Sequence, residues 1–320
     1  MTDFQVATRC VGFAPGIVPA WSDTSFTDSD LAAALFTTGR APGDEVRHGW
    51  ASVAEFVHRS ALIPAYVRQE WGGHLIRSAL ATELDRSEKV NLSYSLGQAM
   101  AGVFAQQRLG VARLMHVDRY SAHHGVSFGP SRERPDLFGV GRGGWVVVEA
   151  KGRSNRMESD LPAKVKAQAS NVASIGGAAP WVACGVVAQF PPPGQTMQLY
   201  ALDPEPTEVA LSWQVDPDRF TEAYYAPFLR ALDVGRSPDL AGVAPAAIEA
   251  ADLGAVGVRI GLHRRLAGLL REREGEAVAG LAREVDSVLE GLPEEEAIRP
   301  DGSWFDTSWG DALGLRDVES

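Results

Sequence analysis

Two carboxylates and a lysine in the middle of the chain have the residue types and the spacing for phosphodiester hydrolysis. Asp136 follows Pro135, and twelve residues separate it from the run Glu149-Ala150-Lys151. This reaction needs a hard divalent cation, which polarises the phosphate and lowers the pKa of the attacking water. Mg²⁺ takes carboxylate and carbonyl oxygens as ligands and keeps several waters. Asp136, Glu149 and the backbone carbonyl of Ala150 are therefore the predicted metal ligands.

Lys151 is placed to assist these carboxylates. Alternate residues of a strand share a face, so Lys151 and Glu149 lie on one side and Ala150 on the other. The ammonium group could hold or activate the attacking water, or offset charge in the transition state. The chain has four lysines and 26 arginines. Unlike arginine, lysine can lose its proton when its surroundings are tuned.

The elements that must position this triad follow from the hydrophobic pattern. Strands over 134–140 and 145–150 flank a glycine turn at 141–144, which would fold Asp136 back towards Glu149. A helix over 95–109, closed by Gly110, precedes them. The remaining predicted elements are a strand over 112–120, a helix over 159–175, and strands over 180–190 and 197–202. Together they describe an α/β sandwich around a mixed sheet.

The triad in this order of elements resembles the PD-(D/E)xK nuclease superfamily, over about residues 86–205. The resemblance implies a restriction-endonuclease-like core with the order αβββαβ. It implies Asp136 and Glu149 as ligands of Mg²⁺, which Mn²⁺ can replace, and Lys151 as the catalytic lysine. Related families often carry a glutamate on the preceding helix, where this chain has Gln98. The implied activity is that of a DNA endonuclease in bacterial defence or DNA processing.

Regions with other compositions flank this core. Residues 1–85 are predicted to be an irregular and helical N-terminal region, with a short helix at 31–36 and helices over 50–85 interrupted at Pro64 and Gly72-Gly73. Residues 206–320 are predicted to be acidic and mainly helical, with a hairpin at 301–305.

The charge of the chain is uneven. Its net charge is −11, whereas nucleic-acid binders usually show a basic surface. Residues 131–170 nevertheless hold eight basic and five acidic side chains, which predicts a local positive face. The predicted DNA contacts are Arg134, Arg153, Arg156, Lys164, Lys166 and Gln168. An ordinary solvated helix face would explain Arg153, Arg156, Lys164 and Lys166 about equally well.

Other functions remain open. Glu149 and Lys151 could form a strand-end ion pair, or the chain could be an inactive nuclease-fold protein that serves as a binding or assembly subunit. The acidic C-terminal region could dock a basic partner or form a homo-oligomer. No run reaches the roughly 18 apolar residues of a membrane span, and no secretory signal is evident, so a cytoplasmic protein is expected.

Three further patterns have simpler explanations than chemistry. His116, His123 and His124 lack further ligands at metal spacing and suggest a polar loop. The glycines at 141–144 precede a strand rather than a helix, so they indicate a turn and not a phosphate-binding loop. Trp304 and Trp309 could stack on bases, but packing of the C-terminal tail is the preferred interpretation.

Overall fold

A mixed β-sheet runs through the centre of the protein. The computed structural model describes residues 2–39, 48–124, 134–155, 161–192, 194–203, 211–235, 240, 243–275, 278–293, 295 and 297–314. The sheet has seven described strands in the order β2-β1-β10-β9-β7-β6-β5. The β1–β10 and β7–β9 pairs are parallel and the other pairs are antiparallel. The strands are β1 (Asp3–Val11), β2 (Trp21–Thr27), β5 (Arg113–His116), β6 (Leu137–Gly141), β7 (Gly144–Arg153), β9 (Val182–Gln189) and β10 (Gln198–Leu202).

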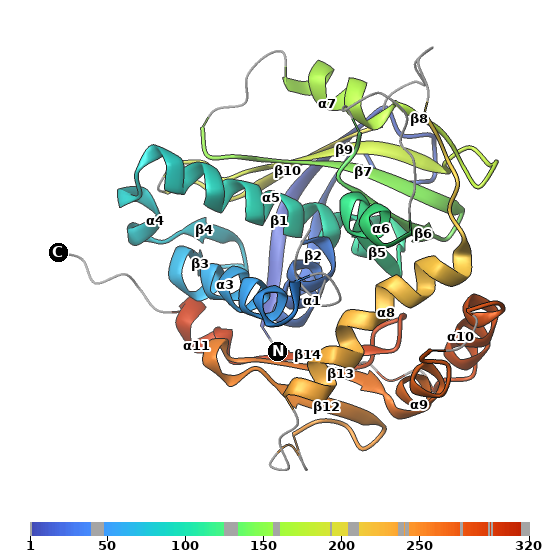
Figure 1. Cartoon of the computed structure of the whole chain (residues 1–320). Coiled ribbons are helices and arrows are strands. Elements are labelled where there is room, and N and C mark those ends of the chain that lie inside the picture. The colour runs from blue at the N-terminus through green and yellow to red at the C-terminus, as the bar shows by residue number, and fades with distance from the viewer. Residues whose placement is uncertain are drawn as a thin grey trace.

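Helices cover both faces of this sheet (Figure 1). Helix α5 (Arg86–Leu109) crosses one face together with α1 (Asp28–Thr38), and α7 (Leu161–Ala169) lies on the other. Helix α5 is well delimited. Asp85 and Glu88 form a capping box at its start, and Gly110 ends it in the left-handed conformation with φ +64°.

Helix α5 approaches β7 backbone against backbone. A Cβ atom at Gly97 would come within 2.5 Å of the amide nitrogen of Gly152. A Cβ atom at Gly152 would come within 1.6 Å of the carbonyl oxygen of Ser93. No side chain fits at either position, so glycine on both elements allows this contact. The side of β7 that carries Gly152 therefore faces α5.

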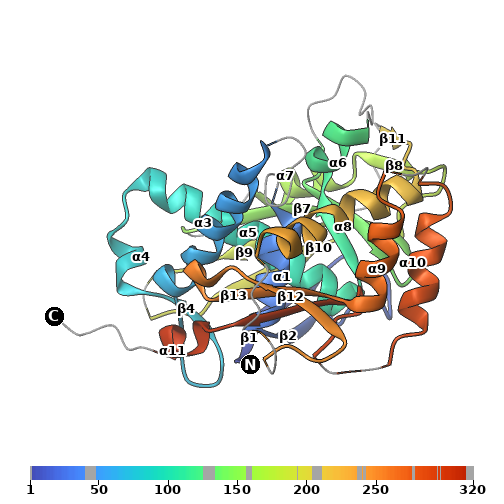
Figure 2. The ribbon, with the colours of Figure 1, turned by 60° about the horizontal axis from the view of Figure 1, so that its bottom comes forward.

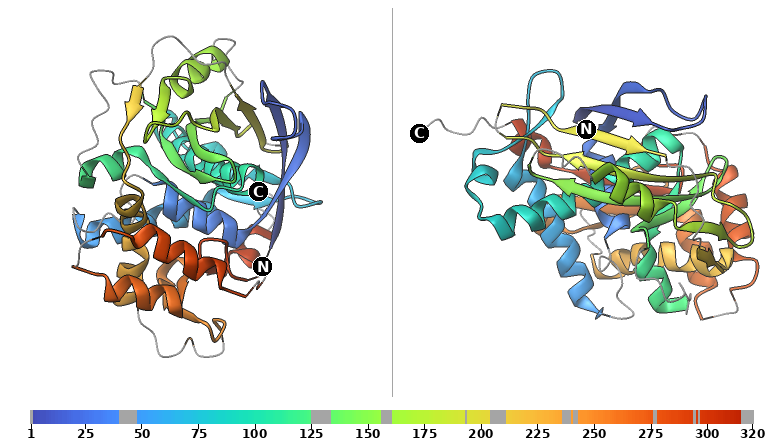
Figure 3. Two further views of the ribbon diagram at one scale, coloured as in Figure 1. Left: turned by 90° about the vertical axis from the view of Figure 1, so that its right-hand side faces the viewer. Right: turned by 90° about the horizontal axis from the view of Figure 1, so that it is seen from above.

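The N-terminal strands lengthen the sheet at one edge, where Figure 3 shows them in dark blue. Only a short helix was predicted within residues 1–45, and it corresponds to part of α1. Strand β1 buries alternate residues, among them Phe4 and Val6. Thr8 on β1 and Thr24 on β2 are also buried and share a hydrogen bond of 2.7 Å. Because these buried positions hold threonine, the alternation of buried and exposed residues in β1 and β2 does not appear hydrophobic in the sequence.

The elements expected over 86–205 are largely present, with two corrections. The strand predicted over 112–120 ends at His116, and α6 (Val117–His124) follows. Val117 and Tyr120 are both buried, which is helical spacing. The helix predicted over 159–175 ends at Ala169, and β8 (Val172–Ile175) pairs in parallel with β11 (Leu211–Trp213). The turn predicted at 141–144 is confirmed between β6 and β7.

Residues 48–84 form helices and a small hairpin. Helix α3 (Trp50–Tyr66) continues through Pro64, so the predicted break there is wrong. A break does occur at Gly72-Gly73, which turn the chain between β3 (Val67–Gln69) and β4 (Leu75–Arg77). Helix α4 (Ala79–Glu83) then leads to α5.

A second sheet and several helices form the C-terminal part, which Figure 2 shows from below. The sheet has the order β12-β13-β14, so this part is less helical than predicted. Its described elements are α8 (Pro217–Val234), β12 (Ile248–Asp252), β13 (Val258–His263), α9 (Arg264–Glu272), α10 (Leu281–Glu290), β14 (Ser303–Thr307) and α11 (Trp309–Gly314). Trp304 and Trp309 are buried, which confirms that they pack.

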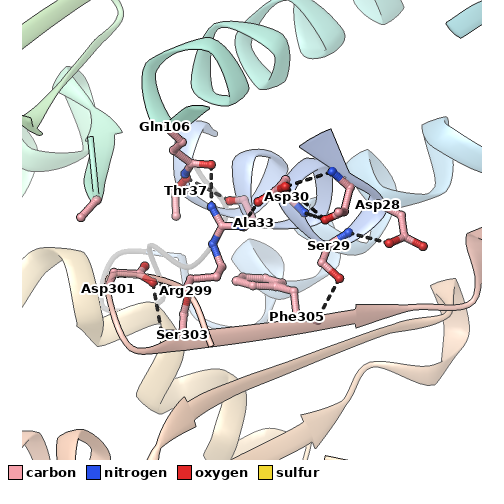
Figure 4. A network of polar contacts seen from close by, with 12 residues as sticks. Asp28, Ser29, Asp30, Ala33, Thr37, Gln106, Arg299, Asp301, Ser303 and Phe305 are labelled. Carbon is pink, nitrogen blue, oxygen red and sulfur yellow. Dashed lines mark hydrogen bonds and ion pairs between the residues drawn. The ribbon is translucent and has the colours of Figure 1, made fainter. Parts of the chain in front are cut away.

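Polar contacts attach this C-terminal part to the main sheet's helices (Figure 4). Arg299 pairs with Asp30 of α1 and donates a hydrogen bond of 2.7 Å to Gln106 of α5. The Ser29 hydroxyl donates to the carbonyl of Phe305 on β14. Among the described residues, no helix has both the length and the apolar character to cross a bilayer.

Candidate active site

The β6–β7 hairpin brings the two predicted carboxylates to neighbouring positions. Leu137 on β6 pairs with Val148 on β7, so Asp136 lies next to Glu149. The carboxylate of Asp136 accepts a hydrogen bond of 3.0 Å from the amide of Ala150. The backbone of β7 thus anchors the Asp136 side chain beside the Glu149 strand position.

Glu149 and Lys151 are in direct contact. The Lys151 Nζ atom lies 2.5 Å from Glu149 Oε1, and their side chains are 28% and 1% exposed. The other oxygen, Oε2 of Glu149, is buried and has no hydrogen-bond partner among the residues that the structure describes. An ion pair between side chains two residues apart fits the shared strand face predicted for them.

The electrostatic surroundings make both carboxylates hard to ionise. Burial raises the pKa of Glu149 to about 7, and the negative charge of Asp136 adds to this effect, while Lys151 opposes it. Burial also raises the pKa of Asp136, against the lowering effects of the Ala150 amide and of Lys151. The pKa of a carboxyl group rises where its charged form is shielded from water and too little positive charge lies nearby.

A pocket of about 570 Å³ opens at this point, between α5 and the end of β7. Strand β6 begins at Leu137, so it borders β7 only up to Val148, and the pocket lies alongside the continuing β7 chain. One wall comes from α5 and the other from the Asp136 region and the end of β7. The lining residues that carry chemistry are Arg86, Lys89 and Tyr94 on α5, and Asp136, Lys151 and Arg153 opposite them.

Gln98 lies apart from the carboxylates. Its Oε1 accepts a hydrogen bond of 3.3 Å from Arg59, and its Nε2 donates one of 2.8 Å to the hydroxyl of Tyr94. Helix α5 faces the Gly152 side of β7, whereas Glu149 and Lys151 occupy alternate positions on the other side. Within the described contacts, Gln98 therefore reaches the pocket through Tyr94 and not through the carboxylates.

The predicted DNA contacts divide into two groups. Arg153 lines the pocket. Arg134 donates a hydrogen bond of 2.7 Å to Asp118, so that carboxylate already engages its guanidinium group. Lys164 and Gln168 lie on α7, away from the pocket lining, with Lys164 exposed and Gln168 half-buried. Arg156 and the side chain of Lys166 lie outside the described residues.

Three pocket residues escaped the sequence prediction: Arg86, Lys89 and Tyr94. They lie on the first turns of α5, and all three border the pocket. Lys89 is also one of the four lysines of the chain, so two of these four line a single pocket. The rarity of lysine in this chain is the sequence feature that could have pointed to Lys89.

The histidines give no second site in the described part of the chain. His116 is buried in β5, where its Nδ1 accepts a hydrogen bond from the amide of Asp118. His124 ends α6, and its side chain lies outside the described residues, as does that of His123. The polar loop predicted for these residues is therefore wrong, because they fall in a strand and a helix.

The site combines two adjacent carboxylates, a lysine and a pocket with basic walls. Among the described residues, no three His, Cys, Asp or Glu side chains gather as a metal-binding group. Mg²⁺ sites often use one or two carboxylates and complete the shell with water and substrate phosphate oxygens. This donor set suits such a hard cation better than a transition metal, which favours imidazole and thiolate. No family model, curated protein or solved structure matches this chain.

Proposed function

We propose that this chain is a divalent-cation-dependent phosphodiesterase with a PD-(D/E)xK-type core, and specifically a nuclease that cleaves DNA. The observation that carries the proposal is the contact between Lys151 and Glu149 beside Asp136, where Lys151 and Asp136 border a pocket that is also lined by Arg86, Lys89 and Arg153. The basic lining residues attract a phosphodiester, and the Asp136 carboxylate beside Glu149 attracts a cation. The basic residues can thus hold the phosphate while the carboxylates hold the cation, as cation-assisted hydrolysis requires.

The carboxylates have an unmet need for positive charge. Glu149 Oε2 is buried and has no partner in the described ranges, and a buried carboxylate is costly unless it is paired. Asp136, Glu149 and the Ala150 carbonyl would hold Mg²⁺ or Mn²⁺. When bound, the cation would polarise the phosphate and lower the pKa of the attacking water.

Lys151 is suited to contact the reacting phosphate. Its ammonium group pairs with Glu149, and Lys151 is one of the residues that line the pocket. A fixed positive charge at this place can donate hydrogen bonds to the attacking water or to a non-bridging phosphate oxygen. Preorganised donors of this kind stabilise negative charge that develops in the transition state.

The order of elements also supports the proposal. Helix α5 is followed by the antiparallel strands β5, β6 and β7, then by α7 on the opposite face and by β9, which runs parallel to β7. This is the αβββαβ order that the resemblance implies, with α6 and β8 as additions. The carboxylates and the lysine lie on the middle hairpin of that series.

The test is cleavage by the purified full chain. Plasmid DNA, single-stranded DNA and RNA are incubated with wild type and Lys151→Ala, with Mg²⁺ or Mn²⁺ and with EDTA. Cation-dependent cleavage by wild type and its loss in Lys151→Ala are expected. Arg283→Ala is the control, because it removes one exposed positive charge on α10, outside the pocket. Equal behaviour of wild type and Lys151→Ala on every substrate would refute the proposal.

A non-cutting binding or assembly protein is the second candidate. It is favoured by the closed ion pair between Lys151 and Glu149 and by the distance of Gln98 from the carboxylates. In such a protein the lysine would neutralise the glutamate permanently, and no cation would enter. Calorimetry that detects Mn²⁺ binding by wild type but not by Asp136→Ala would exclude this candidate.

A further inference from the structure

An exposed aromatic side chain lies in the wall of the basic pocket. Tyr94 is 49% exposed, and Val90, one helical turn earlier, is also exposed. Both line the pocket that contains Lys151 and Asp136. A ligand that consisted of phosphate alone would gain nothing from these apolar surfaces. They suit a ligand that joins negative charge to a flat apolar group.

The position of Tyr94 is built into the fold. Its hydroxyl accepts a hydrogen bond from the Nε2 atom of Gln98, whose side chain is buried. Gln98 is oriented in turn, because its Oε1 atom accepts from the buried guanidinium group of Arg59. An amide with its oxygen on an arginine must present its NH₂ group on the other side. Arg59 and Gln98 are thus positioning residues for the Tyr94 ring.

The charge of the pocket limits how many phosphates it can bind. Arg86, Lys89, Lys151 and Arg153 line it, with Asp136 as the carboxylate in the lining and Glu149 paired with Lys151 behind it. A protein that holds duplex DNA commonly makes about 6–10 phosphate contacts. Four cations suit a shorter backbone segment. In a duplex, moreover, neighbouring bases cover both faces of each base, so an aromatic ring reaches only an unpaired or extruded one.

We infer that the pocket binds an unpaired nucleotide within a single strand of DNA or RNA, with its base stacked on Tyr94 and its flanking phosphates on the four cations. The inference deepens the proposed function, on which it rests, because it names the strand state of the nucleic acid that Lys151 would meet. The pocket volume of about 570 Å³ lies within the range of about 300–1,000 Å³ usual for small-ligand pockets.

The first experiment measures binding without cleavage. Short single strands of DNA and of RNA carry one 2-aminopurine, whose fluorescence falls when it stacks, and binding is followed in EDTA. Wild type should quench the fluorescence, and Tyr94→Ala should weaken binding by roughly 5- to 150-fold, the range measured for loss of one stacked base. Tyr94→Phe keeps the ring and should retain most of the quenching.

Two controls separate stacking from other effects. Trp71→Ala removes an aromatic side chain that is 96% exposed in the β3–β4 turn, away from the pocket, and should bind like wild type. The logarithm of the binding constant should fall with the logarithm of the salt concentration with a slope of about −3, as expected for four phosphates on a single strand. A slope twice as steep would indicate a longer contact surface.

The outcomes distinguish this inference from the proposed function. Single-strand binding that depends on Tyr94, in a protein that never cleaves, would support the inference and refute the nuclease. Cation-dependent cleavage of duplex DNA that is indifferent to Tyr94→Ala would support the nuclease and overturn the inference. Failure to bind either single strand, or equal binding of the matching duplex, would also overturn it.

Discussion

Glu149 and Asp301 are both almost completely buried, yet their surroundings differ. Asp301 is 2% exposed and accepts hydrogen bonds from the hydroxyl of Tyr224 and from the amide and hydroxyl of Ser303. Glu149 has Lys151 at Oε1, and within the described part of the chain Oε2 has no donor in hydrogen-bond geometry, although the Asp136 amide nearby helps to stabilise the carboxylate. Buried polar groups are nearly always satisfied in folded proteins, and exceptions concentrate at functional sites. Asp301 therefore serves the fold, and Glu149 is left with capacity for a ligand.

The largest expected effect concerns activity. Glu149→Gln keeps the shape of the side chain but removes its charge, so cation-dependent cleavage should fall by about 10³-fold. Thermal unfolding should show an intact fold. Glu222→Gln on α8 changes an exposed glutamate outside the pocket and should leave cleavage unchanged. If Glu149→Gln cleaved at the wild-type rate, Glu149 would have no functional role that sets it apart from Asp301.

The next effect concerns stability. Asp301→Ala leaves the Tyr224 hydroxyl and the Ser303 amide without their acceptor, and should lower the free energy of unfolding by about 3 kcal/mol. Urea denaturation measures this loss. Tyr224→Phe removes one of these bonds together with its donor and should cost about 1 kcal/mol. If Asp301→Ala unfolds at the wild-type urea concentration, the satisfied network contributes little to the fold.

A third effect depends on pH. The pKa of Glu149 is raised to about 7 in the folded protein, from an ordinary value of 4.5. The folded state thus binds this proton more tightly, so stability should fall as pH rises from about 4.5 to 7, by up to about 3 kcal/mol. Glu149→Gln should remove this loss, being more stable than wild type at pH 8 and equal to it near pH 4. If the stability of wild type and of Glu149→Gln changed equally with pH, the loss of stability would not come from the raised pKa of Glu149.

The smallest effect concerns cation affinity. Because Glu149 must lose its proton to bind a cation, Mn²⁺ affinity should rise about fivefold between pH 6 and 7 and level off above pH 8. Calorimetry in two buffers with different ionisation heats should also detect proton release at pH 6. Glu149→Gln is the control, since its weaker binding should lose most of this pH dependence. A flat profile in wild type would mean that the proton on Glu149 does not compete with the cation.

The hairpin of the site could be predicted from sequence because its parts are close together in the chain. The glycine turn and the β-branched run of β7 fix the register that places Asp136 beside Glu149. The pocket could not be predicted in the same way. Its other wall comes from the start of α5, about 50 residues upstream of Asp136, and only tertiary packing brings Tyr94 to Lys151.

The secondary structure predicted from the sequence is wrong where the local residue pattern fits more than one kind of element. Strands β1 and β2 bury Thr8 and Thr24 against each other, and a buried threonine pair reads as polar sequence. The segment after His116 contains β-branched and aromatic residues typical of strands, but Val117 and Tyr120 are buried at helical spacing. Tyr120 packs on Phe138 and Phe220, so contacts distant in sequence decide its conformation.

The contact between Gly97 and Gly152 has a consequence for how the pocket accepts ligands. The separation of its two walls is set by main chain resting on main chain, with no side chain between them that could rearrange. The spacing between the α5 and β7 backbones therefore cannot adjust to a ligand through side-chain rotamers at this contact. One methyl group added at either glycine would push α5 away from β7 and widen the space between the two backbones. Substitution of Gly97, which is not among the lining residues, would thus alter which molecules enter without changing a residue that touches them.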